Sequence, residues 1–224
     1  MALSASGLIA GRNDVKPRPV LPLIASRGAS GAGKSTARRL VAGELEPRVQ
    51  CVELHDLVPI PRVPTLGWRQ RASEAVVRHA LELQKHGRHV LLAGDPVAAG
   101  EVLAAPSADR LDAIAVCLLD VDRDTQAARL LARGDDPALL VHHVAFADWM
   151  REHAADPDHR PEVLQTNGWE QMRWERWRSL SDAGSWAMHV LDTSSLTADE
   201  VAAELLAWCR IALAGQAPAM RIPS

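Results

Sequence analysis

Short apolar runs alternate with amphipathic helical patterns along most of this chain. Five of the runs have the length and the content of branched aliphatic residues that are typical of buried strands. They cover residues 21–25, 49–54, 89–93, 113–119 and 188–191. Because buried strands separated by helices form parallel sheets that are covered on both faces, the pattern predicts an α/β fold with a five-stranded parallel sheet.

The helices between these runs have recognisable ends. Residues 68–86 place apolar side chains on one face and stop before Gly87, which suits a left-handed C-terminal cap. Asp124 is placed to cap a helix that ends at Gly134. Residues 197–200 have the capping-box sequence and predict a last helix from residue 198 to about residue 214.

The same pattern sets the limits of the folded unit. Residues 1–19 show no periodicity, and we expect a flexible N-terminal lead-in there. Residues 20–214 then form a single domain, followed by a C-terminal tail over residues 215–224. Residues 135–185 fit the alternation least well, and we expect a helical insertion there, between the fourth and fifth strands.

The composition agrees with one compact domain and excludes several classes of partner. The chain has 224 residues, 47% hydrophobic and 24% charged, with a net charge of -3. This charge gives no basic surface for nucleic acid, so we expect no nucleic-acid partner. No membrane association is expected either, because the N-terminus lacks a signal-peptide pattern and no apolar run approaches the ~20 residues that span a bilayer. Three scattered cysteines in apolar surroundings are typical of reduced, buried thiols and favour a cytoplasmic location.

A glycine-rich motif follows the first apolar run. It reads Gly28-Ala29-Ser30-Gly31-Ala32-Gly33-Lys34-Ser35, matches G-x-x-x-x-G-K-[ST], and precedes a helix rich in alanine and arginine. In this context the glycines let backbone N–H groups turn toward phosphates, and the helix N-terminus adds a partial positive charge. A plain glycine turn at the start of a helix is the alternative.

The motif assigns chemistry to two of its side chains. Lys34 would contact the outer phosphates of a nucleoside triphosphate, and the Ser35 hydroxyl would hold Mg²⁺. Only three of the 25 basic residues are lysines, which makes the lysine at this position more informative. The segment from Gly28 to Thr36 is therefore the expected binding site for ATP, or a similar nucleotide, with Mg²⁺.

Other classes of phosphate-loop protein lack support in this sequence. The chain has no Asn-Lys-x-Asp sequence, which specifies guanine in GTPases of the Ras type. It also shows neither the signature helix of transport ATPases nor the longer domain and sensor helix of ring-forming ATPases. The small kinases remain.

Over most of residues 20–214 the chain resembles the small-molecule kinases of the adenylate kinase-like superfamily, near the shikimate, gluconate and chloramphenicol kinases. The segments that carry the resemblance are residues 25–36, the apolar run ending at Asp95, residues 119–122 leading to residues 129–134, and residues 190–194. The resemblance implies a three-layer α/β/α P-loop NTPase fold with the sheet order 2-3-1-4-5 and a helical lid. Substrates would bind at the carboxyl ends of the strands.

The resemblance also implies roles for individual residues. Asp56, just past the second strand, matches a carboxylate that accepts the proton of the acceptor hydroxyl, or it is an ordinary helix cap. Asp95 would hold a Mg²⁺-bound water and is a better candidate than Asp120, whose strand is expected on the other side of the loop. Arg129 and Arg133, four residues apart on one helix face, would neutralise charge on the transferring phosphate, or they are solvated.

The acceptor side gives weaker signals. The insertion is longer than the compact lid of the shikimate kinases, and four of its side chains follow helical spacing toward a core: Trp169, Met172, Trp177 and Leu180. Trp174 would lie on the opposite face, where it either covers a substrate ring or sits at the surface. Adjacent histidines, His142 and His143, do not have zinc-ligand spacing. Three arginines either bind an anionic acceptor or are solvated: Arg62, Arg69 and Arg71.

These observations predict an enzyme, an ATP-dependent phosphotransferase that moves the γ-phosphoryl group to a hydroxyl of a small molecule. The expected partners are a nucleoside triphosphate and a small-molecule acceptor, and the expected assembly is a monomer or a homodimer. A nucleoside or nucleotide kinase is one alternative. A nucleotide-binding regulatory protein with weak ATPase activity is the other.

Overall fold

A computed structural model of the chain describes residues 22–27, 30–93, 97–182 and 184–222. Five strands form one sheet in which each neighbouring pair is parallel, in the order β2-β3-β1-β4-β5. They are β1 (Pro22–Arg27), β2 (Val49–Val52), β3 (His89–Leu92), β4 (Ala113–Asp120) and β5 (His189–Asp192). Strands and order agree with the sequence-based expectation.

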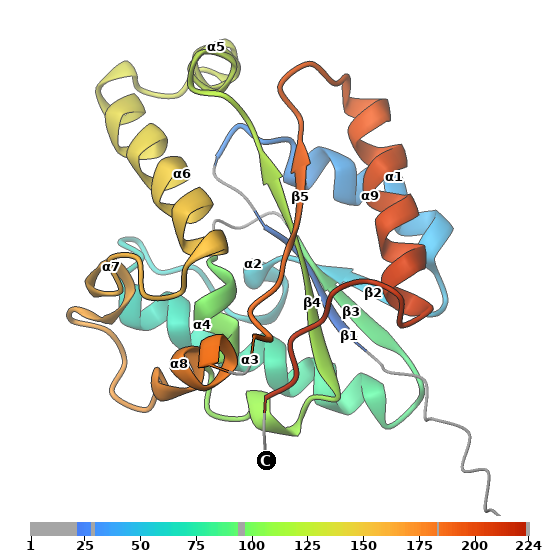
Figure 1. Ribbon diagram of the computed structural model, residues 1–224. Coiled ribbons are helices and arrows are strands. Elements are labelled where there is room, and N and C mark those ends of the chain that lie inside the picture. Colours follow the sequence, from blue (N-terminus) through green and yellow to red (C-terminus); the bar gives the residue numbers. More distant parts are fainter. Residues whose placement is uncertain (1–21, 28–29, 94–96, 183, 223–224) are drawn as a thin grey trace, which may run out of the picture.

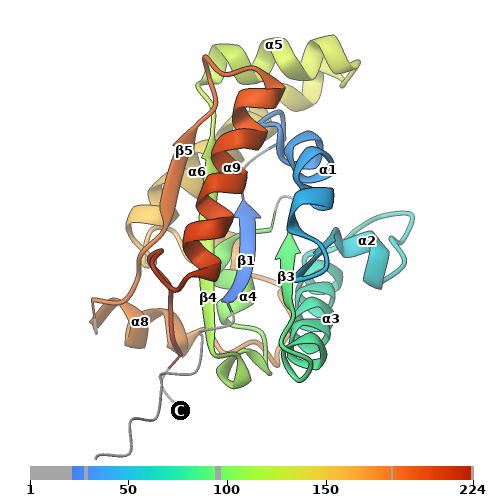
Figure 2. The same ribbon diagram turned by 90° about the vertical axis from the view of Figure 1, so that its right-hand side faces the viewer.

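Helices cover both faces of this sheet (Figures 1 and 2). On one side lie α1 (Lys34–Leu45) and α9 (Ala198–Leu213). On the other lie α3 (Leu66–Gln84), α4 (Ala99–Leu103), α6 (Leu140–Ala155) and α8 (Glu175–Asp182). Successive side chains of a strand point to opposite faces, so Val90 and Leu92 join the core under α3, and Leu91 joins the core under α1 and α9.

The helix ends follow the local sequence, with one correction. Gly87 and Gly134 have φ values of 68° and 89°, the left-handed conformation expected after a helix. The cap of α5 (Arg123–Arg133) was predicted wrongly: the side chain of Asp122, and not Asp124, accepts the hydrogen bond from Thr125 N at 2.8 Å. Asp122 is extended and precedes the helix, whereas Asp124 already lies in its first turn.

The insertion is helical but is less continuous than expected. After α6 come a short α7 (Glu162–Gln165) and then α8, which begins only at Glu175. The predicted helical spacing from Trp169 is therefore wrong over its first residues, because Arg173 N donates to Ala104 O at 2.7 Å and ties this segment to the end of α4. Trp174 packs against Trp177 with ring centroids 5.0 Å apart. The shorter elements are α2 (Leu54–Leu57), η1 (Ala108–Arg110) and η2 (Pro137–Leu139).

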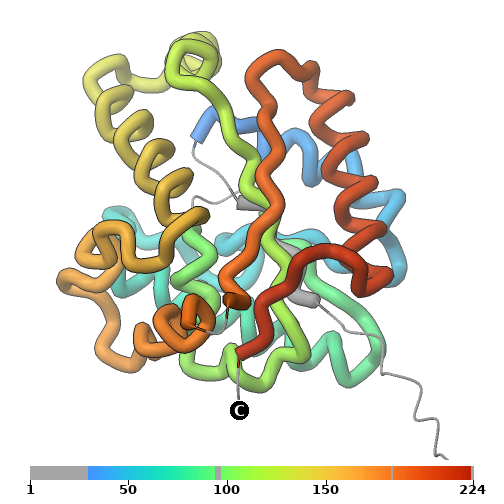
Figure 3. Tube along the Cα trace, in the orientation of Figure 1, coloured from blue at the N-terminus to red at the C-terminus, as the bar shows by residue number. Residues whose placement is uncertain are grey.

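The chain returns to the sheet after α9. Met220 is fully buried, and it exchanges backbone hydrogen bonds with Ile114 at 2.8 and 2.9 Å. Figure 3 traces this last segment back to β4. The packed body therefore extends past residue 214. Within the described ranges, every helix is too short or too polar to cross a membrane.

Candidate nucleotide-binding site

The glycine-rich loop has the backbone geometry that its sequence predicts. Gly31 and Gly33 have φ values of 86° and 87°, in the left-handed region that glycine adopts readily. The first bond inside α1 runs from Ala37 N to Gly33 O, so the N–H groups of the first turn have no acceptor within the helix. The unpaired N–H groups at the start of α1 therefore form, together with the loop, a site that can bind an anion. Gly28 and Ala29, also predicted to bind nucleotide, lie outside the described residues.

Side chains from outside the loop hold two successive loop carbonyls. The pairs are Gln126 Nε2 with Ser30 O at 2.9 Å and Arg129 Nη1 with Gly31 O at 3.4 Å. The Thr193 hydroxyl lies 3.5 Å from Ala32 O, but its one hydrogen is better placed for Asp120 O at 2.8 Å. The C=O group of one residue and the N–H group of the next lie in the same planar peptide unit, so fixing these two carbonyls restricts where the loop N–H groups point. These hydrogen bonds therefore help to hold the loop in the conformation that the structure shows.

A depression of about 270 Å³ lies between the loop and α5. Its walls are Ser30, Gly31, Gly33, Lys34, Ser35, Thr36, Arg129 and Arg133. Lys34 is only 4% exposed, and Ser35 and Thr36 are half-buried. The fold thus brings the described part of the predicted loop together with both predicted arginines, and it gives the depression a positive charge.

The two arginines are held differently. Arg129 is half-buried, and its Nη2 donates to Thr193 O at 2.7 Å and to Leu196 O at 3.3 Å, so it joins α5 to the segment before α9. Arg133 is exposed and forms an ion pair with Asp135, two residues away. Arg133 can therefore move toward a ligand by exchanging one surface ion pair, whereas Arg129 is fixed by backbone carbonyls.

At the end of β2, a second carboxylate lies beside the predicted one. Asp56 is exposed, and its Oδ2 accepts from Glu53 N at 2.7 Å. The side chain of Glu53 is 13% exposed and pairs with Arg38 at 2.9 Å and with His55 at 3.3 Å. Sequence reasoning missed Glu53, although it is the first residue after β2 and stands at the carboxyl edge of the sheet.

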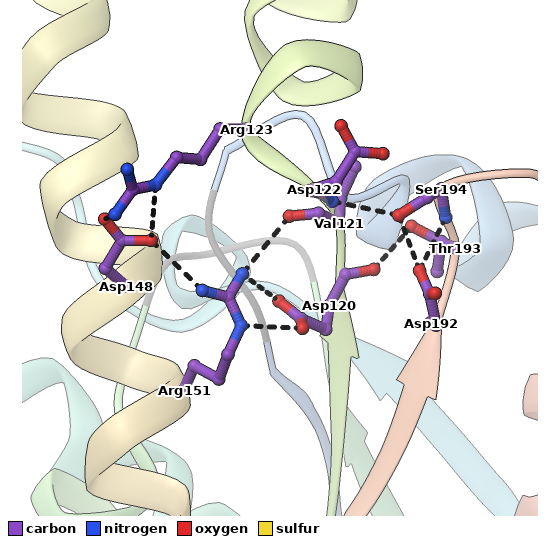
Figure 4. Close-up of polar contacts among 9 residues, drawn as sticks. All are labelled: Asp120, Val121, Asp122, Arg123, Asp148, Arg151, Asp192, Thr193 and Ser194. Atoms are coloured by element: carbon purple, nitrogen blue, oxygen red, sulfur yellow. Dashed lines mark hydrogen bonds and ion pairs between the residues drawn. The ribbon is translucent and has the colours of Figure 1, made fainter.

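The predicted metal residue Asp95 lies outside the described residues. Asp120, at the end of β4, is engaged elsewhere, because both of its carboxylate oxygens accept from Arg151 of α6 (Figure 4). Arg151 also pairs with Asp148 of α6, and Asp148 pairs in turn with Arg123 of α5. A chain of ion pairs therefore connects the sheet to α6 and then to α5. In the described parts of the chain, no group of three or more His, Cys, Asp or Glu side chains is arranged to hold a metal ion.

Of the three arginines considered for an anionic acceptor, Arg69 is the one with a fixed position. Its Nε donates to Glu101 at 2.8 Å, and Glu101 is fully buried. The guanidinium also lies 5.7 Å from the centroid of the Phe146 ring on α6. Arg62 and Arg71 are exposed.

Comparison with known proteins identifies the fold and leaves the activity open. No family model matches the chain, and no curated protein matches it. Among solved structures, a gluconokinase from Sinorhizobium meliloti 1021 is similar over 87% of this chain and 95% of its own, with 18% identity and a TM-score of 0.54. A structure of the Pnkp1/Rnl/Hen1 RNA repair complex is similar over 62% of this chain and 47% of its own, with 16% identity and a TM-score of 0.47. The chain has the fold of a P-loop kinase.

Proposed function

We propose that this protein is an ATP-dependent phosphotransferase that moves the γ-phosphoryl group of ATP to a hydroxyl of a small molecule. The observation that carries the proposal is the depression between the loop and α5. It combines two left-handed glycines, a helix N-terminus, a buried lysine and two arginines within one small volume. These groups can stabilise the negative charge of the outer phosphates of a nucleoside triphosphate. They can also stabilise the charge that spreads over a transferring phosphoryl group.

In this proposal Lys34 contacts the outer phosphates, and Arg133 approaches the transferring group after leaving Asp135. The Ser35 hydroxyl, which lines the depression, is the donor that would hold Mg²⁺, and Asp95 would bind one of its waters. Held there, Mg²⁺ would supply positive charge that neutralises part of the negative charge of the phosphates. The fixed hydrogen bonds of Arg129 favour a role in positioning the loop rather than in contacting phosphate.

The acceptor hydroxyl would enter from the carboxyl ends of β2 and β3. Its oxygen forms the new bond to the γ-phosphorus, the bond to the β–γ bridging oxygen breaks, and the hydroxyl proton passes to a carboxylate. Asp56 and Glu53 are the candidates for that carboxylate. The position of Arg69, with both terminal nitrogens free of hydrogen bonds to the described residues, favours an acceptor that carries a carboxylate or another anion.

The test is a screen for acceptor-stimulated ADP release over sugars, polyols, sugar acids, nucleosides and aminoglycosides, with mass spectrometry of the product. We expect one class to stimulate release and to gain a phosphoryl group, and Lys34→Ala to abolish nucleotide binding or turnover. With that acceptor, comparison of Asp56→Asn with Glu53→Gln identifies the base, whose loss should lower kcat by about 10²- to 10⁴-fold.

Three results would change the assignment. Unchanged nucleotide affinity and activity in Lys34→Ala would contradict the nucleotide site itself. Stimulation by nucleosides or nucleoside monophosphates alone would indicate a nucleoside or nucleotide kinase. Tight nucleotide binding without stimulation by any acceptor class would favour the regulatory protein with weak ATPase activity.

A further inference from the structure

Gln126 connects the nucleotide-binding loop to the insertion through one side-chain amide. The residue lies on α5 and is fully buried. Its Nε2 donates to Ser30 O in the loop at 2.9 Å and to His143 O in α6 at 3.3 Å. An amide nitrogen has two hydrogens, so both donors are used, one on each side.

The loop lies close to Gln126 at Gly31. A Cβ atom added at Gly31 would lie 3.4 Å from Gln126 Cγ, from Gln126 O and from Leu130 Cγ, so a single added carbon would bring the loop into contact with α5. Gly31 also has a φ of 86°, which a residue other than glycine adopts only with strain. Because Gln126 Nε2 also donates to Ser30 O at 2.9 Å, a movement of the Ser30–Gly31 peptide would either strain this hydrogen bond or move the Gln126 side chain with it.

The oxygen of the Gln126 amide indicates that this side chain does more than fill space. Gln126 Oε1 is buried and has no hydrogen-bond partner among the described residues. Turning the amide over would not help, because it would place an oxygen against two carbonyl oxygens. Burying an unpartnered acceptor is unfavourable, and an apolar side chain of the same length would fill the space without this cost.

We propose that Gln126 is a positioning residue that couples occupancy of the nucleotide-binding loop to the stability of the first half of α6. The inference rests on the proposed nucleotide site. Phosphates that accept hydrogen bonds from the loop N–H groups fix the loop peptides, Ser30 O among them, and so hold the Gln126 amide in place. The same amide then holds His143 O, the carbonyl that also accepts the helical bond from Ala147 N.

The route through Gln126 is separate from the ion pairs that fix the second half of α6. Arg151 attaches that half to Asp120, and Trp149, Met150 and His153 are buried in the core. In the first half, Val141 is 66% exposed and His142 is exposed. Further along, Phe146 packs against the core and Ala147 is buried. The hydrogen bond from Gln126 therefore acts mainly on the first turns of α6, where it can change how often the helix opens.

The experiment compares Gln126→Met with a matched control. Methionine keeps the length and volume of the side chain but removes both donors, and Gln171→Met makes the same change at an exposed position in the insertion. Affinity for a non-hydrolysable ATP analogue is measured by calorimetry. Hydrogen exchange of residues 140–147 is followed with and without the analogue, and the unfolding midpoint is recorded.

In the wild-type protein and in the control, we expect the analogue to slow exchange in residues 140–147. In Gln126→Met we expect affinity to fall by about fivefold to tenfold, the worth of one hydrogen bond, and the slowing to disappear while the unfolding midpoint stays near that of the control. If Gln126→Met does not fold, Gln126→Asn removes the reach to both carbonyls with a smaller polar side chain.

Wild-type affinity together with an unchanged exchange response in Gln126→Met or Gln126→Asn would overturn the inference. That failure is distinguishable from failure of the proposed function, because Lys34→Ala tests the nucleotide site alone. If Lys34→Ala loses binding and the Gln126 variants do not, only the coupling through Gln126 is wrong. If Lys34→Ala binds normally, the nucleotide site is wrong as well.

Discussion

Arg151 and Asp120 face each other in a two-point ion pair, with Nε to Oδ2 and Nη2 to Oδ1 both at 2.8 Å. The pair joins α6 to the carboxyl end of β4. On its other side, Asp120 O accepts hydrogen bonds from Thr193 N and Thr193 Oγ1, each at 2.8 Å (Figure 4). One residue thus attaches the insertion to the sheet and also fixes the segment that contacts Arg129 and the nucleotide-binding loop.

Breaking this pair should loosen the insertion. Asp120 is 22% exposed and Arg151 is 37% exposed, so removing Arg151 leaves a partly desolvated carboxylate without its main partner. We expect Arg151→Met to lower the free energy of unfolding by about 1 kcal/mol, a value reduced for screening by solvent. Urea denaturation measures this change.

The control for that substitution is Lys85→Met, which removes an ion pair to Glu82 in which both side chains are more than half exposed. It should change stability by less than about 0.5 kcal/mol. Equal effects of Arg151→Met and Lys85→Met would show that the pair at the end of β4 adds nothing beyond an ordinary surface contact.

The buried imidazole of His153 should make the protein sensitive to acid. His153 is 2% exposed, stacks on Trp149 at 4.6 Å, and neither ring nitrogen meets hydrogen-bond geometry with a partner in the described structure. Burial, with a smaller contribution from the charge of His159, lowers its pKa to about 4 from the ordinary value of 6.5. The folded protein therefore resists protonation that the unfolded chain accepts.

The sign of the effect follows from linkage. As pH falls from 6.5 toward 4, the unfolded state binds a proton at His153 that the folded state does not, so stability decreases with slope up to about 1.4 kcal/mol per pH unit. We expect His153→Phe to have a shallower loss over this range in urea titrations at several pH values. The matched change at exposed His142, His142→Phe, should leave the wild-type pH dependence; equal pH profiles for all three proteins would exclude His153 as the cause.

Gly100 on α4 is required by close packing, not by its backbone angles. An added Cβ would lie 2.6 Å from Trp177 Cε2 and 2.8 Å from His153 Nε2, and Gly100 O accepts from Trp177 Nε1 at 2.8 Å. We expect Gly100→Ala to lower the free energy of unfolding by about 1–3 kcal/mol and to alter the near-ultraviolet spectrum of the tryptophans.

A Gly→Ala substitution should have the opposite effect on stability at Gly43 on α1, where an added Cβ meets nothing within 4 Å. Gly43→Ala should stabilise the protein by about 0.5–1 kcal/mol, because alanine restricts the unfolded chain and favours helix. Thermal unfolding of the two variants side by side gives the comparison. A stable Gly100→Ala variant would mean that Trp177 and His153 can move aside.

Local signals predicted the sheet well. Each strand is a short run of apolar residues whose hydrophobicity does not depend on distant contacts, and the boundaries of β3 and β4 agree with the runs to within a residue. The helix end at Gly134 and the capping box of Thr197 and Glu200 were also predicted correctly, because helix caps depend on residues three or four apart. Asp122 was missed as a cap because aspartate stands at both 122 and 124, and only the backbone angles select one.

Contacts between segments that are distant in the sequence could not be predicted from local patterns. Arg173 N reaches Ala104 O, and this bond prevents the helix that the spacing of Trp169 and Met172 suggested. The same holds for Glu53: its neighbours in sequence do not reveal that Arg38, one turn beyond Lys34 and Ser35, would neutralise it. Such pairs depend on how strands and helices are placed in space, which no local pattern encodes.

The sequence by itself determined the parallel α/β fold and the position of the glycine-rich loop, because strand hydrophobicity, glycine conformation and the Gly-Lys-Ser motif act within a few residues. The tertiary structure decided which side chains serve that loop. It assigned Arg129 to one loop carbonyl, Gly31 O, and left Arg133 exposed, and it placed Gln126 between Ser30 and His143. These roles depend on the packing of α5 against the loop, which arises only when segments nearly a hundred residues apart are brought into contact.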